Sequence, residues 1–410
     1  MPKKIYLLIS AVCMMSMFFY GWVGFAQPPQ PSVRLTTNPP IAQIRPLEAE
    51  ATEAMGSGQY KPPVQLTLQA IDAQGQALKN ARIHLQILTP SKTPWFTTDF
   101  PIVEGTQLLD IEGNAPTGQL QVQQTLPIRG TYQLLVNVTP IVPNTFAPIQ
   151  QTLTLSVSEN GAKYSNFGIL AAVLLTAGLG GGWVIGSRQA MQPGEVVPER
   201  VRLLLSGAIG VAIVALLFIN ISSEFAQPHS HTSMEAPHEA EESHEAEESP
   251  SKPAKRQSQG LEMQLSGDTN ATVGQPAQLQ VSVIDAKTRQ PATDVVLKVI
   301  TRSLENNWVA FAYEGTPDST GKLAWQQQFF DGAPHSIEVE AVSQATATRK
   351  FQPFQVGQSI EVEGVAPPLS VRLISLGYLT AIVAVGLLLG LWLRRRRKQR
   401  SDTDWKQSFS

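Results

Sequence analysis

Four of the six histidines in this 410-residue chain lie within one short hydrophilic segment. His229 and His231 stand in "PHSHTSM", whereas His238 and His244 belong to the hexapeptide "HEAEES", which occurs twice in direct succession. Neutral imidazole is a good ligand for Zn, Cu and Ni, and carboxylates can complete such a site. A histidine-rich tract of this kind therefore predicts capture of a divalent transition metal.

Glutamates accompany these histidines and supply further candidate ligands. The stretch from 235 to 248 holds seven glutamates and no lysine or arginine. If the repeat becomes helical, Glu242 and Glu248 each follow a histidine by four residues and share its face. The predicted metal ligands are His229, His231, His238, His244, Glu242 and Glu248.

Two other interpretations of this segment remain open. It has negligible apolar content and several prolines, so it should not fold alone, and its histidines could be incidental to a solubilising spacer. Alternatively it responds to pH, because imidazole titrates near neutrality and neighbouring glutamates favour its charged form.

The remaining two histidines give weaker signals. His84 stands alone in the strand-like "ARIHLQI", where a structural or surface role is the more common one. His335 follows Asp331 by four residues in "DGAPHSIEVE" and could act as a ligand or a base. The chain lacks a phosphate-binding glycine loop after a strand, a serine elbow and a cysteine nucleophile, since Cys13 lies in an apolar N-terminal run. We therefore expect a protein that is not an enzyme, with catalysis by Asp331 and His335 as the least favoured alternative.

Three apolar runs have the length of membrane-spanning helices. Phe167–Ile185, Leu203–Ile219 and Leu373–Leu393 each approach the roughly 20 residues needed to cross a hydrocarbon core. Basic residues stay on the cytoplasmic side, and they occur in the loop after the first run and in "RRRRKQR" after the third. The histidine-rich segment and both long polar regions are thus predicted to lie outside the cytoplasm, in a bacterial-type plasma or internal membrane protein. "MPKK" before the apolar run Ile5–Ala26 has the layout of a signal peptide or N-terminal anchor.

The predicted organisation follows from these runs. The segments are 1–26 signal peptide or anchor, 27–59 linker, 60–160 first β-sandwich, 166–186 transmembrane helix, 187–202 cytoplasmic loop, 203–222 transmembrane helix, 223–259 His/Glu-rich linker, 260–364 second β-sandwich, 371–393 transmembrane helix and 394–410 basic cytoplasmic tail.

Glycines recur every four residues in the apolar runs. Gly178, Gly182 and Gly186 form one stripe, and Gly386 and Gly390 form another. Such stripes let helix backbones approach closely, within one chain or between chains of an oligomer. The runs contain no Asp, Glu, Lys or His, which argues against a transporter.

The two long polar regions contain a repeated sequence. "VQLTLQAIDAQGQALKNARIHLQILT" (64–89) aligns with "AQLQVSVIDAKTRQPATDVVLKVIT" (277–301), "TGQLQVQQ" (117–124) with "TGKLAWQQQ" (320–328), and "GTYQLLVNV" (130–138) with "GAPHSIEVEA" (332–341). Apolar and polar residues alternate between turn signals, as in a β-sandwich. We predict two immunoglobulin-like β-sandwiches, related by duplication and joined to transmembrane α-helices.

Two aromatic positions can be assigned within this fold. Tyr132 follows "RGT" just before a strand, where a tyrosine corner would lie, and Trp325 is a predicted core residue. His335 aligns near Tyr132 and is expected to make the corresponding hydrogen bond to the backbone.

This layout resembles the small immunoglobulin-like domains of the YtkA and FixH type. The resemblance covers 64–138 and, less closely, 277–341, and depends on Ile71, Asp72, Ala73, Gly130, Tyr132, Leu134 and Val136. It implies exported or membrane-anchored modules, several of them associated with copper handling or cytochrome oxidase maturation. Where those domains often carry a methionine/histidine segment, this chain has "PSKTPWFTTDFP" (90–101), so the resemblance implies the fold and no ligands.

Together these patterns predict a non-catalytic integral membrane accessory protein. It would present its sandwiches and tether outside the cytoplasm and bind Cu, Zn or Ni in support of a metal transporter or metalloenzyme assembly. Its partner would be another membrane or extracytoplasmic protein, and no basic domain indicates nucleic-acid binding. The alternative is a structural or envelope protein-interaction module with a merely solubilising linker.

Overall fold

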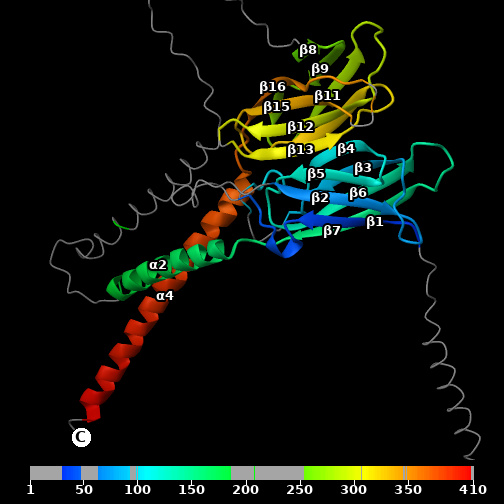
Figure 1. Cartoon of the computed structure of the whole chain (residues 1–410). Helices are drawn as coiled ribbons and strands as arrows, with labels where there is room; N and C mark the ends of the chain where they lie inside the picture. Colours follow the sequence, from blue (N-terminus) through cyan, green and yellow to red (C-terminus); the bar gives the residue numbers. More distant parts are fainter. Residues whose placement is uncertain are drawn as a thin grey trace, which may run out of the picture.

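The computed structural model describes residues 30–47, 63–185, Gly207 and 254–407, apart from short gaps at 93–97, 99, 306, 345–346 and 348. The described part consists of a β body and two long helices (Figure 1).

The first half of the β body holds seven strands and one short 3-10 helix. They are β1 (Ser32–Asn38), η1 (Ile41–Gln43), β2 (Val64–Ile71), β3 (Ala81–Leu88), β4 (Gln107–Ala115), β5 (Gln119–Gln124), β6 (Gly130–Pro140) and β7 (Ile149–Val157). Every second residue of β2 and β3 is buried, which matches the alternation in their sequences.

The second half holds nine strands. They are β8 (Ala254–Ser258), β9 (Leu261–Gly267), β10 (Asn270–Thr272), β11 (Pro276–Asp285), β12 (Val295–Ser303), β13 (Val309–Gly315), β14 (Lys322–Gln328), β15 (His335–Ser343) and β16 (Phe354–Glu363).

The strands form two eight-stranded sheets, and each sheet contains strands from both halves. One sheet has the order β1-β2-β5-β13-β12-β15-β16-β10, and the other has the order β7-β6-β3-β4-β14-β11-β9-β8. A seam joins the halves where β5 pairs with β13 and β4 pairs with β14, both antiparallel. The inner faces of both sheets contribute to one buried apolar cluster. The predicted all-β, two-layer architecture is present, but the sheets run on through the seam.

Side-chain hydrogen bonds reinforce this seam. Thr106 Oγ1 donates to Gln328 Oε1 over 2.9 Å, and Gln107 Nε2 donates to Gln326 Oε1 over 3.0 Å. Two further bonds end on backbone oxygens, from Asn114 Nδ2 to Pro317 O (2.8 Å) and from Thr125 Oγ1 to Val309 O (2.7 Å). The halves are therefore tied by side chains as well as by the strand ladders.

Two strands lie in segments that were predicted to be linkers. β1 falls within 27–59 and pairs along its whole length with β2, while β8 falls within 223–259 and pairs with β9. Exposure alternates along β1, but Val33 is its one buried side chain, and β8 has none, so neither strand has a strong apolar pattern in the sequence.

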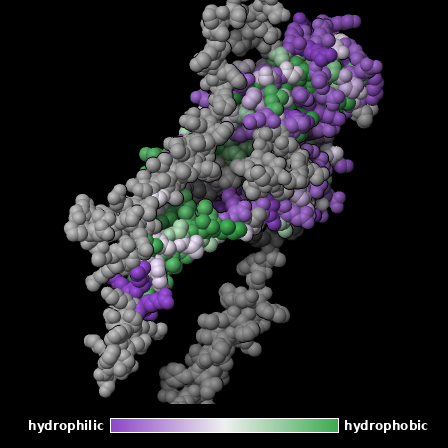
Figure 2. All heavy atoms as spheres, turned by 90° about the vertical axis from the view of Figure 1, so that its left-hand side faces the viewer, coloured by the Kyte–Doolittle hydropathy of each residue, from purple (hydrophilic) through white to green (hydrophobic). Residues whose placement is uncertain are grey.

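Both helices are long and apolar enough to cross a membrane. α2 (Gly161–Ile185) and α4 (Leu369–Gln407) contain the candidate spans Lys163–Ile185 and Leu369–Arg397. Hydrophobic side chains gather over the helices, whereas the β body presents a mainly hydrophilic surface (Figure 2). The predicted span at 203–222 lies outside the described residues, apart from Gly207.

The glycine stripes predicted from sequence bring α2 and α4 together. A Cβ added to Gly178 would overlap Val383 O, and one added to Gly182 would overlap Leu387 O. Gly386 and Gly390 lie equally close to the backbone of α2. Because higher numbers in α2 meet higher numbers in α4, the two helices run in parallel.

Candidate functional site

The predicted metal ligands lie outside the described residues. This holds for His229, His231, His238, His244, Glu242 and Glu248. Within the described residues, no three side chains of His, Cys, Asp or Glu come together in a group able to hold a metal ion.

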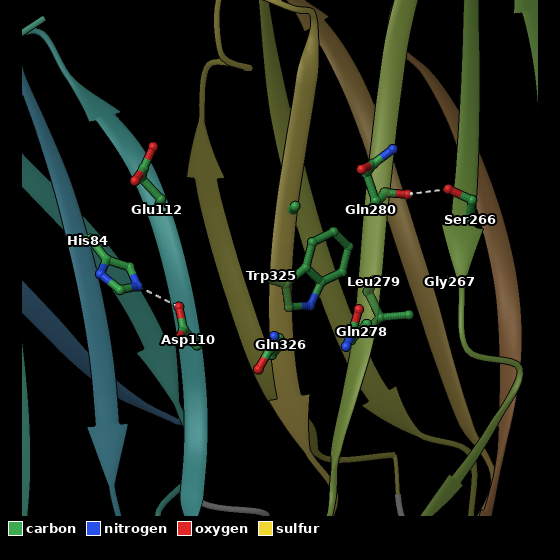
Figure 3. A pocket seen from close by; sticks show the side chains of 11 residues that line it. His84, Asp110, Glu112, Ser266, Gly267, Gln278, Leu279, Gln280, Trp325 and Gln326 are labelled. Carbon is green, nitrogen blue, oxygen red and sulfur yellow. Dashed lines mark hydrogen bonds and ion pairs between the residues drawn. The ribbon is translucent and has the colours of Figure 1, made fainter.

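A hollow of about 430 Å³ opens on the outer face of the second sheet and crosses the seam. β3 and β4 contribute His84, Asp110 and Glu112 on one side of the hollow. The polar residues on the other side come from β9, β11 and β14, and they include Ser266, Gln278, Gln280 and Gln326 (Figure 3). A ligand in this hollow would touch both halves of the β body at once.

His84 and Asp110 form the tightest polar pair in this hollow. His84 Nε2 lies 2.6 Å from Asp110 Oδ1, and the two side chains are 39% and 25% exposed. The hydrogen bond to Asp110, aided by the charges of Asp110 and Glu112, raises the pKa of His84 despite its partial burial. The hydrogen bond and the neighbouring charges thereby favour the positively charged form of the imidazole.

The sequence could indicate some residues of this site, but not how strand pairing brings them together. His84 lies directly across the ladder from Glu112, and Asp110 is opposite Gln86, so all three charged groups project from the same face. The alternation in "DIE" could have indicated that Asp110 and Glu112 share a face. Only the pairing of β4 with β14 brings them next to the second half.

His335 lies in the core rather than in an accessible site. Its side chain is 0% exposed, Nδ1 donates to Ala333 O over 2.8 Å, and Nε2 lies 3.4 Å from Asp331 Oδ1. Its ring packs against Trp308 and Phe329, with centroids 5.6 and 4.7 Å away. Burial lowers the pKa of His335 to about 4, against the raising effect of the bond to Ala333. The imidazole is therefore neutral at pH 7.

As expected, His335 and Tyr132 make corresponding side-chain hydrogen bonds to the backbone. Tyr132 is fully buried, and its hydroxyl accepts from Ile128 N (3.0 Å) and donates to Ile128 O (2.7 Å). Both side chains thus hold the backbone just before the strand that carries them. The predicted tyrosine corner at Tyr132 and the core position of Trp325 are confirmed.

No protein-family model and no curated protein matches the chain. Among solved structures, a copper-bound variant of FetP from uropathogenic Escherichia coli strain F11 is 11% identical, with 28% of this chain and 97% of FetP covered at a TM-score of 0.21. The adhesin InvE of Yersinia pseudotuberculosis is 9% identical over 82% of this chain and 61% of its own length, with a TM-score of 0.18. A two-domain fibronectin type III segment of chicken tenascin is 9% identical over 74% of this chain and 95% of its own length, with a TM-score of 0.15.

Similarities at this level carry no conclusion about what the chain binds. The resemblance to YtkA- and FixH-type domains stays a prediction, because no family match accompanies it.

Proposed function

We propose that the chain is a non-catalytic integral membrane accessory protein that holds its β body at the outer surface of the membrane. One observation carries this proposal: both helices begin almost where the strands end. Residues 158–160 join β7 to α2, and residues 364–368 join β16 to α4. Such short connections from two different sheets leave the β body little freedom to move away from the helix pair.

The two halves of the body are proposed to be duplicated immunoglobulin-like domains. The order β7-β6-β3-β4 in the first half corresponds to β16-β15-β12-β13 in the second, and β1-β2-β5 corresponds to β9-β11-β14. These matching orders support the repeat found in the sequence.

The proposed task of the protein is to capture Cu, Zn or Ni with the His/Glu-rich tether, in support of a metal transporter or of metalloenzyme assembly in the same membrane. The four histidines of the tether precede β8, which lies at the end of the same segment. A protein-interaction module is the second candidate, favoured by the polar hollow that spans the seam. Catalysis by His335 is not proposed, since this side chain is fully buried.

Metal titration of the purified full chain in detergent tests the first proposal. We expect calorimetry with Zn(II), Cu(II) and Ni(II) to show binding that is lost when His229, His231, His238 and His244 are all changed to alanine. The matched control is His84→Ala, which removes a histidine from the hollow and leaves the tether intact. Equal binding by the wild-type chain and the fourfold variant would show that the tether is only a spacer.

A further inference from the structure

The basic end of α4 lies against the last turn of α2. Arg394 Nη1 donates a hydrogen bond to the carbonyl oxygen of Trp183 over 2.5 Å. The guanidinium carbons of Arg394 and Arg397 lie 5.7 and 5.8 Å from the centre of the Trp183 ring. On another side of α4, the guanidinium carbon of Arg396 lies 4.0 Å from the ring centre of Trp392.

Helix geometry separates these arginines into two groups. Arg394 and Arg397 are three residues apart, so they share a face, and that face meets α2. Arg395 and Arg396 project in other directions. The close backbone approach of Gly390 to Trp183 places the Trp183 ring at the same end of the helix pair as Trp392. Tryptophans at the end of an apolar span typically mark the membrane–water interface.

The arginine pair is well suited to a phosphate group. Among the side chains that the structure describes, which in α4 end at Arg397, no carboxylate forms an ion pair with any of Arg394–Arg397. A guanidinium presents parallel N–H groups that match two phosphate oxygens, and the aromatic ring beside it helps to fix its orientation. The apolar surfaces of both helices lie immediately next to this pair, where acyl chains would be.

We propose that Trp183, Arg394 and Arg397 form a binding site for the phosphate of an anionic phospholipid at the interface between α2 and α4. Arg394, anchored on the α2 carbonyl, and Arg397, one turn further on, hold the phosphate between them. The acyl chains of the lipid then run along the exposed apolar side chains of the two helices. This inference rests on the proposed membrane anchoring and adds the class of lipid and the residues that select it.

Quenching of tryptophan fluorescence by brominated lipids tests the site in the full chain. The protein is reconstituted in phosphatidylcholine vesicles in which either phosphatidylglycerol or an equal fraction of phosphatidylcholine carries brominated acyl chains. We expect stronger quenching by the brominated phosphatidylglycerol, and we expect Trp183→Phe to abolish most of the difference. The double variant Arg394→Gln/Arg397→Gln should also lose it.

The matched control is Arg395→Gln/Arg396→Gln, which removes the same charge from other faces of α4 and should retain the preference. An equal loss in both double variants would mean that the basic segment attracts anionic lipid without a defined site, and would overturn the inference. Equal quenching by the two brominated lipids in the wild-type chain would overturn it as well. Absence of quenching by either lipid would instead contradict the membrane anchoring itself.

Discussion

The core contains two buried tyrosines, Tyr132 and Tyr313, that differ in the hydrogen bonding of their hydroxyl groups. Tyr132 satisfies its hydroxyl on both backbone groups of Ile128, whereas the hydroxyl of Tyr313 is buried without a hydrogen-bond partner among the described residues. A buried hydroxyl without a partner costs free energy, and a satisfied one contributes roughly 0.5–1.5 kcal/mol per bond.

The same substitution should therefore have different effects at these two positions. We expect Tyr132→Phe to lower the free energy of unfolding by about 1–2 kcal/mol, because two backbone groups of Ile128 lose their partner. Tyr313→Phe should leave stability unchanged or raise it. Guanidinium unfolding of the full chain in detergent, followed by fluorescence, measures both. Equal losses would show that Tyr313 has a hydrogen-bond partner such as buried water.

His335 should make the protein less stable in mild acid. Its folded-state pKa of about 4 lies below the ordinary value of 6.5, so the unfolded chain binds more protons between these values. Its contribution is complete above about pH 6.5 and falls as the pH drops towards 4, by at most ~1.4 kcal/mol per pH unit. We expect His335→Gln to flatten the loss of stability between about pH 6.5 and 5, measured by unfolding at several pH values. An unchanged slope would exclude His335 as its source.

His84 should have the opposite effect on how stability depends on pH. Because its pKa is raised, mainly by the hydrogen bond to Asp110, its pairing stabilises the fold below the ordinary pKa and is lost as pH rises through the folded value. The pair is partly exposed, so the effect should be small. NMR titration of the imidazole should show a pKa above 6.5 that returns towards it in Asp110→Asn. An unshifted wild-type value would contradict this assignment.

At the scale of elements, the glycine stripes predict that a larger side chain is tolerated at some glycines of the helices and destabilises the chain at others. Gly182 faces the α4 backbone, whereas a Cβ on Gly180 in the same helix meets nothing within 4 Å. We expect Gly182→Ile to force the helices apart and destabilise the chain by about 1–3 kcal/mol, as overpacking does elsewhere. Gly180→Ile should be tolerated. Thermal unfolding in detergent compares the two variants, and similar melting temperatures would argue against this helix interface.

Sequence patterns predicted which segments form strands and helices better than they predicted which of these elements pack against each other. Alternation located β2, β3 and β11, and the four-residue glycine spacing indicated close helix contact. It did not show that α2 pairs with α4, because either stripe could have met another helix or another chain. β1 was missed because only Val33 is buried in it. The hollow was missed for a related reason: His84 appears isolated until the ladder places it opposite Glu112.

At the scale of the whole molecule, the seam joins the two halves into one β body, because both sheets contain strands from each half. The repeated sequence contained no sign of this, since edge strands rich in glutamine could equally have faced solvent. We expect calorimetry of the full chain to show a single unfolding transition for the β body, because both sheets cross the seam.

Loss of the seam bonds should uncouple the halves. Asn114→Ala/Thr125→Ala removes two hydrogen bonds to the second half and should broaden or split the calorimetric transition. The control Thr36→Ala removes a bond to Thr67 within the first half and should leave one sharp transition. Two resolved transitions in the wild-type chain would mean that the halves unfold independently.

The continuous sheets also have a consequence for biosynthesis. β5 ends at Gln124 and its seam partner β13 begins at Val309, so the first half is synthesised long before the strands that complete its sheets. At about 5–20 residues per second, synthesis of the intervening chain takes roughly 10–40 s. During that interval the edges of β4 and β5 remain open to pairing with other chains. The newly made first half is thus the stage at which this protein is most exposed to aggregation and in greatest need of a chaperone.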